Sequence, residues 1–124
     1  TDVHRYVREL EESIIRTLSR FGIKGSRIEG YTGVWVKADR PGDQNRKICA
    51  IGVHLSRWVT LHGFALNVNT DLSFFDNIIP CGIADDDKTV TSMQKELGRA
   101  LDMDEVKKIF KEEFAAVFGL EYES

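Results

Sequence analysis

The sequence predicts a single α+β domain in which a mixed or antiparallel sheet is flanked by helices. A long amphipathic helical pattern opens the chain, short runs of β-branched and aromatic residues fill its middle, and a second helical pattern closes it. The 124 residues amount to one domain and contain no internal repeat or low-complexity stretch.

The first element is an amphipathic helix, predicted over residues 2–21, with Asp2 as its N-cap and Gly22 as its stop signal. Apolar residues recur at steps of three and four, at Val3, Tyr6, Val7, Leu10, Ile14, Leu18 and Phe21. Charged residues occupy the opposite face, at Arg5, Arg8, Glu9, Glu11, Glu12 and Arg16. This charged face is predicted to be solvated.

Two short β-rich runs follow the helix. Residues 27–29 and 32–36 predict the strands of a hairpin that turns at Gly30 and Tyr31. Residues 38–46 contain proline, glycine, aspartate and asparagine, so they predict an exposed loop.

Two longer strands are predicted over residues 47–55 and 58–69, with a turn at Ser56 and Arg57. Residues 49–53 are almost unbroken apolar sequence, which is typical of a strand buried on both faces. These strands are therefore expected at the centre of the sheet.

The remaining chain predicts turns and helices. Residues 70–90 are rich in turn formers, with a short helix over 72–76, and residues 91–98 predict another short helix. A capping box of Asp102 and Glu105 opens the last helix, which ends at Gly119. Its apolar side chains are predicted to be buried, at Val106, Ile109, Phe110, Phe114, Val117 and Phe118.

Charge and composition exclude several classes of partner. Seventeen basic and twenty acidic residues give a net charge of −3, which does not favour nucleic acid as a partner. The sequence contains no run of about 18 apolar residues, so it predicts no membrane span. Two cysteines are too few for a disulfide framework, and no signal-peptide pattern is present, so a cytoplasmic location is expected.

Cys81 is the candidate nucleophile. Pro80 before it and Gly82 after it place the thiol on a rigid, tight turn where a ligand can approach the backbone. A buried, inert thiol is the alternative for the same residue. Cys49, between Ile48 and Ala50, has the context of a core residue.

Lys47 begins the apolar strand, 34 residues before Cys81. A lysine in this place is commonly a solvent-facing end residue. A partly buried ammonium beside a thiol would instead favour the thiolate, and a desolvated lysine can act as a base. Only the fold can bring Lys47 and Cys81 together.

His62 and Gly63 lie inside the predicted strand 58–69. A glycine there often marks a close approach of ligand or backbone. His62 is a base, a substrate contact or a core histidine that is fully hydrogen-bonded. The sequence lacks the glycine-rich motifs that cradle phosphates and the paired cysteine and histidine spacing of a structural zinc site. No metal is expected.

Three segments together resemble the octanoyltransferases of lipoate biosynthesis, also called lipoyl(octanoyl) transferases. They are residues 47–53, residues 57–68, and Pro80-Cys81-Gly82 with the Val90-Thr91-Ser92 that follows. The first helix and residues 30–36 are similar to the family as well. The resemblance implies a fold like that of biotin-protein and lipoate-protein ligases.

The resemblance also implies an activity. These enzymes take an octanoyl group from octanoyl-acyl carrier protein and pass it to a lysine of a lipoyl domain. The acceptors are lipoyl domains of 2-oxoacid dehydrogenases and the glycine-cleavage H protein. No cofactor is implied, because the donor is already an activated thioester.

The resemblance assigns roles to particular residues. Cys81 matches the family cysteine that forms an acyl-thioester, and Lys47 matches the lysine that lowers the pKa of that cysteine. His62 is expected to contact substrate. The acyl site is implied to be lined by Ala50, Ile51, Gly52, Gly63, Phe64 and Ala65.

Family members carry an upstream Arg-Gly-Gly…Thr-x-His-Gly-x-Gly segment that lines the rest of the acyl pocket, and it is absent from these residues. Residues 1–124 are therefore expected to be the C-terminal part of a single catalytic domain. Two alternatives stay open: an ATP-dependent lipoate or biotin ligase, and a truncated, non-catalytic remnant that binds lipoyl domains.

Overall fold

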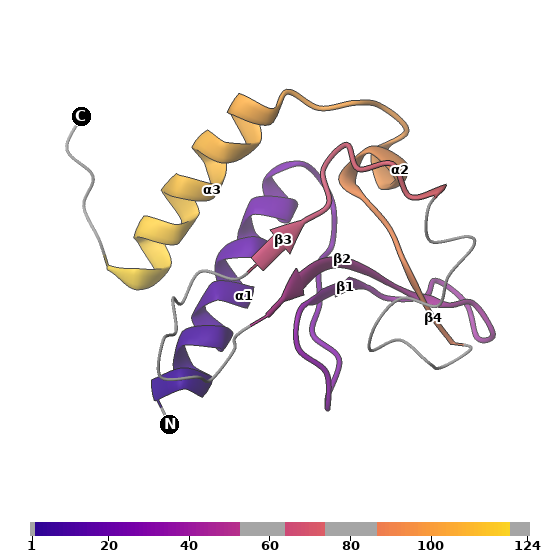
Figure 1. The fold of residues 1–124 in the computed structure, drawn as a ribbon, viewed down its shortest axis with the longest axis horizontal. Coiled ribbons are helices and arrows are strands. Elements are labelled where there is room, and N and C mark those ends of the chain that lie inside the picture. The colour runs from indigo at the N-terminus through magenta and orange to yellow at the C-terminus, as the bar shows by residue number, and fades with distance from the viewer. Residues whose placement is uncertain (1, 53–63, 74–86, 120–124) are drawn as a thin grey trace.

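A computed structural model describes residues 2–52, 64–73 and 87–119, and confirms the predicted α+β class with a mixed sheet (Figure 1). The helices and strands, in chain order, are α1 (Asp2–Arg20), β1 (Val34–Val36), β2 (Asn45–Ile51), β3 (Phe64–Leu66), β4 (Lys88–Val90), α2 (Met93–Leu97) and α3 (Met103–Phe118).

Strand β2 is the centre of the sheet. Its residue Cys49 pairs with Val34 of β1 on one edge and with Leu66 of β3 on the other, both antiparallel. Beyond the end of β3, the first half of β2 pairs with β4 in parallel, with Asn45 opposite Lys88. The longest strand therefore holds all the others in place.

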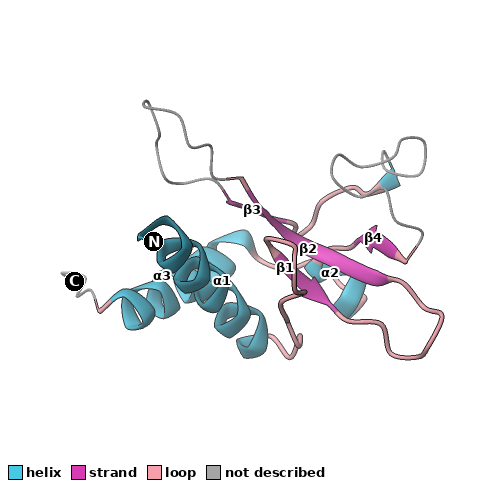
Figure 2. Ribbon diagram, turned by 90° about the horizontal axis from the view of Figure 1, so that it is seen from below, coloured by secondary structure: helices cyan, strands magenta, loops and turns pink. Residues whose placement is uncertain are grey.

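The helices lie in two places around the sheet. Helices α1 and α3 run side by side in opposite directions, and α2 lies apart from them (Figures 1 and 2). Exposed ion pairs from Arg20 to Glu112 and Glu113 join α1 to α3. Helix α2 is tied to the first half of β2 by Arg46, which donates two hydrogen bonds to Glu96 at 2.9 and 3.0 Å.

The core lies where α1 faces the sheet. The fully buried side chains of α1 are Leu10, Ile14 and Leu18, at the three- and four-residue spacing that predicted the helix. Ser13 and Thr17 are also buried, and their hydroxyls donate to the carbonyls one turn earlier, of Glu9 and Ser13. These two buried hydroxyls are thus paired within the helix.

The predicted hairpin of residues 27–29 and 32–36 is wrong. Within residues 32–36 only Val34–Val36 forms a strand, and its partner is β2. Residues 27–29 form no strand, and Ser26, just before them, makes a single antiparallel bridge to Trp35. The reason is local: Gly33 has a φ of +99° and donates its N–H to the Glu11 carboxylate at 3.0 Å. That N–H is therefore lost to strand pairing.

The predicted strand bounds also need correction. Strand β2 begins at Asn45, inside the predicted loop 38–46, because the Asn45 N–H donates to the Asp87 carbonyl at 2.8 Å. Strand β3 stops at Leu66, since the Asn67 and Val68 carbonyls accept from the first N–H groups of α2. Strand β4 lies within the segment predicted as turns.

Parts of three predicted elements lie outside the described residues. These parts are the ends of the two long strands with the turn at Ser56 and Arg57, and most of the short helix over 72–76.

The caps predicted for α3 are observed: Asp102 accepts from the Asp104 N–H at its start, and Gly119 ends it in the left-handed conformation. Helix α2 has caps that were not predicted from the sequence, since Ser92 accepts from the Lys95 N–H and Gly98 is left-handed. Asp2, predicted as the N-cap of the first helix, is the first residue of α1.

The predicted burial of the α3 apolar face is only partly right. Val106 is buried, at 3% exposure, but the other apolar side chains of the face are half-buried. Helix α3 packs chiefly against α1, and the sheet covers only part of its length. Its phenylalanines stack in a row, with ring centroids 5.6 Å apart for Phe110 and Phe114 and 4.3 Å apart for Phe114 and Phe118.

Gly33 should tolerate no side chain. A β-carbon there would lie 2.5 Å from the Cys49 carbonyl oxygen, whereas one on Gly42, whose φ of +92° is similar, would meet nothing within 4 Å. We expect Gly42→Ala to cost about 1–2 kcal/mol from backbone strain. Gly33→Ala should cost about 1–3 kcal/mol more because of the clash. Urea unfolding measures both, and equal costs would contradict this account of β1 and β2.

Candidate functional site

Lys47 lies near the middle of β2, half-buried, and not at an exposed strand end. It pairs with Trp35 on one edge and with Val90 on the other. Its carbonyl accepts from the Thr91 N–H at 2.8 Å. The backbone of Lys47 is thus held from both sides, which fixes the point from which its side chain extends.

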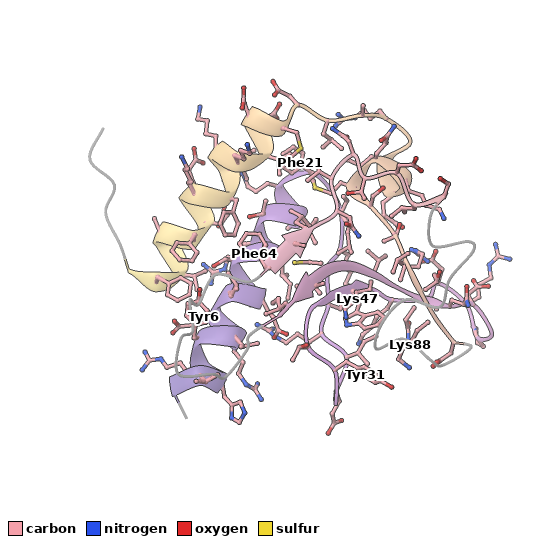
Figure 3. All side chains as sticks on the ribbon, in the orientation of Figure 1. Tyr6, Phe21, Tyr31, Lys47, Phe64 and Lys88 are labelled. Atoms are coloured by element: carbon pink, nitrogen blue, oxygen red, sulfur yellow. The ribbon has the colours of Figure 1, made fainter. Side chains whose placement is uncertain are left out.

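The Lys47 side chain lies over an aromatic ring. Its Nζ is 5.3 Å from the centroid of the Trp35 ring, within the range of a cation–π interaction. The Trp35 ring meets Tyr31 edge to face, at 5.9 Å between centroids, and Lys88 Nζ lies 4.6 Å from the Tyr31 centroid. Figure 3 shows Lys47, Tyr31 and Lys88 gathered beside β1 and β2.

A buried carboxylate lies behind this group. Glu11 of α1 is 5% exposed, accepts from the Gly33 N–H at 3.0 Å and accepts from Arg27 Nε at 3.0 Å. Arg27 also donates to the Arg8 carbonyl at 2.9 Å. Glu11 was predicted to belong to the solvated face of the helix, which is wrong, because these donors replace its water.

Arg46, the neighbour of Lys47, is held by a second carboxylate. Glu96 accepts from Arg46 and also from the Thr91 hydroxyl at 2.6 Å. Burial alone would raise the pKa of Glu96, but these hydrogen bonds outweigh it and lower the pKa. The ionised Glu96 thus joins α2 to β2 and to Thr91, the residue after β4, next to Lys47.

The described residues predicted for the acyl site are on neighbouring strands. Ala50 pairs with Ala65, and both are exposed, whereas Ile51 pairs with Phe64. Since side chains alternate along a strand, the two pairs face opposite sides of the sheet. Ile51 is buried, and the Phe64 ring packs against Phe110 at 5.0 Å. Gly52, just past β2, is exposed.

Three predicted site residues, Cys81, His62 and Gly63, lie outside the described residues. The site roles of all nine residues therefore stay predictions. The other cysteine, Cys49, is fully buried, as its sequence context predicted.

Within the described ranges no group of three or more histidine, cysteine, aspartate or glutamate side chains is arranged to hold a metal. No helix of the same ranges has the length and apolar character needed to cross a membrane.

Trp35 and Glu11 are the features that sequence reasoning missed. A signal existed for Glu11, because it follows Val7 by four residues and precedes Ile14 by three, which places it on the apolar side of the helix. Trp35 carried no comparable signal, since its contact with Lys47 depends on a strand register that brings together residues 12 apart in the sequence.

A family comparison matches residues 1–115 to the "Lipoyl protein ligase A/B catalytic domain". This agrees with the ligase-like fold that the sequence predicts.

Several similar proteins bear the name octanoyltransferase. The one from Cytophaga hutchinsonii is 52% identical over 124 residues, which are 100% of this chain and 50% of that protein. The one from Flavobacterium johnsoniae is 59% identical over 113 residues, 90% of this chain and 47% of that protein. The one from Myxococcus xanthus is 53% identical over 120 residues, which are 97% of this chain and 33% of that protein. The chain spans about half the length of the first two relatives and a third of the last.

Cys49 should be an inert thiol whose burial is visible in the pH dependence of stability. Burial raises its pKa from 9.0 to about 12, against the opposing charge of Lys47. Its contribution to stability is therefore complete below about pH 9 and is lost as the pH rises toward 12. The difference between the unfolding free energies of the wild type and Cys49→Ala should fall by about 1.4 kcal/mol per pH unit in that window. Unfolding free energies that change in parallel with pH in the two proteins would refute this assignment of a buried thiol.

Proposed function

The chain belongs to the lipoyl protein ligase A/B catalytic domain family, and we propose that it carries the catalytic cysteine and lysine of an octanoyltransferase. One observation carries the proposal: relatives named octanoyltransferase are more than half identical to this chain over nearly its whole length. The half-buried setting of Lys47 supports it, because a lysine in the middle of a sheet is not a simple solvent-facing residue.

The proposed reaction has two steps. The Cys81 thiolate attacks the carbonyl carbon of octanoyl-acyl carrier protein, a tetrahedral intermediate forms, and the carrier thiol leaves. The amine of an acceptor lysine then attacks the octanoyl-Cys81 thioester, forms the amide and releases the Cys81 thiolate. The acceptors are lipoyl domains of 2-oxoacid dehydrogenases and the glycine-cleavage H protein.

Lys47 is proposed to act on Cys81 by its charge and by proton transfer. An ammonium within about 4–6 Å of a thiol favours the thiolate and lowers its pKa from about 8.5. When the carrier thiolate leaves in the first step, this ammonium can donate a proton to it. The resulting neutral amine can then take the proton that the attacking amine loses in the second step. The site needs no ATP and no metal for this, since the octanoyl thioester is already activated.

The exposed pair of Ala50 and Ala65 is proposed as part of the surface along which the octanoyl chain lies. Their small side chains leave room above the sheet, and the exposed Gly52 extends this surface past the end of β2. Ile51 and Phe64 would support the same strands from the opposite face. His62 and Gly63 are proposed to contact substrate nearby.

Residues 1–124 are proposed to be the C-terminal part of one catalytic domain, in which an upstream segment contributes the rest of the acyl pocket. The partial coverage of the relatives supports this arrangement. A cytoplasmic location is proposed as well.

Intact-protein mass spectrometry after incubation with octanoyl-acyl carrier protein tests the proposal. We expect an octanoyl adduct on Cys81 that hydroxylamine removes and that needs no ATP. The adduct should be absent in Cys81→Ala and should persist in Cys49→Ala. Loading should slow by about 10²–10⁴-fold in Lys47→Ala. It should be unchanged in Lys107→Ala, a matched change at an exposed lysine of α3.

The octanoyltransferase of Cytophaga hutchinsonii serves as the positive control. If the relative acquires an octanoyl adduct and the wild-type chain does not, residues 1–124 do not suffice for octanoyl transfer to cysteine. An adduct that requires ATP would favour the ligase, and acceptor binding without any adduct would favour the non-catalytic remnant.

A further inference from the structure

The structure assigns Trp35 the role of a positioning residue for Lys47, an inference that rests on the proposed function. Trp35 is the β1 residue opposite Lys47, and its ring lies beneath the ammonium, 5.3 Å from Nζ to the centroid. The negative face of an indole ring attracts a cation more strongly than the rings of tyrosine or phenylalanine do. The ring therefore selects, among the many rotamers of a lysine, those that keep Nζ over β1.

Trp35 is itself rigid. Its side chain is completely buried, and its N–H and C=O both bond to Ser26, at 2.8 and 2.7 Å. The ring also packs edge to face against Tyr31. A ring held on so many sides can impose a position on a flexible neighbour, whereas a mobile ring could not.

The indole nitrogen points to the same role. Among the described residues, Trp35 Nε1 is the buried side-chain polar atom that has no hydrogen-bond partner. Burying an unpaired donor is unfavourable, so packing alone would favour phenylalanine at this place. Tryptophan at this position is therefore explained by the larger face of its indole ring, on which the Lys47 ammonium lies, and not by its N–H.

A second contact confines the stem of Lys47. A β-carbon on Gly33 would lie 3.0 Å from Lys47 Cε, so only glycine leaves space for the stem there. The Glu11 carboxylate fixes this glycine by accepting its N–H. Lys47 is therefore confined by Gly33 at its stem and by Trp35 at its head.

Nuclear magnetic resonance of a chain labelled with ¹³C-lysine tests the inference. The ring current of Trp35 should shift the ε-methylene signal of Lys47, which is assigned by its loss in Lys47→Met. The shift should disappear in Trp35→Leu and should persist, reduced, in Trp35→Phe. Lys107, an exposed lysine of α3, is the internal control, and its signal should keep its place in both variants.

The loading rate of Cys81 gives the second readout. We expect Trp35→Leu to load octanoyl about tenfold more slowly and Trp35→Phe to recover much of that loss. An unmoved Lys47 signal in Trp35→Leu would overturn the inference, as would a moved signal with an unchanged loading rate. If Trp35→Leu does not fold, Trp35→Phe decides by the same two readouts. A wild type that takes no octanoyl group would count against the proposed function alone, because the Lys47 signal would still report its position.

Discussion

The pairing of β2 on both of its edges is the constraint on which the rest of the structure depends. Strand β1 uses one edge, and β3 and β4 share the other, so the backbone of β2 has little freedom to shift. A slip by one residue would exchange the two faces of the strand and would carry Lys47 to the side of Ala50. The sheet register therefore decides which side chains surround Lys47.

Two carboxylates secure this register from opposite ends of the fold. Glu11 joins α1 to the Gly33 turn, while Glu96 joins α2 to Arg46 and Thr91. Each is largely shielded from water and accepts from more than one donor, which is the arrangement that makes a buried carboxylate tolerable. Both carboxylates lie close to Lys47. Among the described residues, neither forms an ion pair with the Lys47 ammonium, so they shape the site without neutralising that charge.

The sequence predicted the helices well because each is defined by local signals. The spacing of Leu10, Ile14 and Leu18 predicts α1, and the cap at Asp102 with the terminal Gly119 predicts α3. Strand β4 was missed because three residues are too short for a periodic pattern, and its parallel partners on β2 lie 43 residues earlier in the sequence. The candidate site divides in the same way: Lys47 was predicted from its motif, but Trp35 and Glu11 depend on contacts that only the fold creates.

The central claim is that β2 holds Lys47 where it acts on Cys81, and the pH dependence of Cys81 alkylation tests it most directly. Cys49→Ala leaves Cys81 as the sole thiol of the chain, so iodoacetamide reports on one residue. In this background the alkylation midpoint should lie below about 8.5, and Lys47→Met should raise it toward that value. The same midpoint in both proteins would contradict the claim.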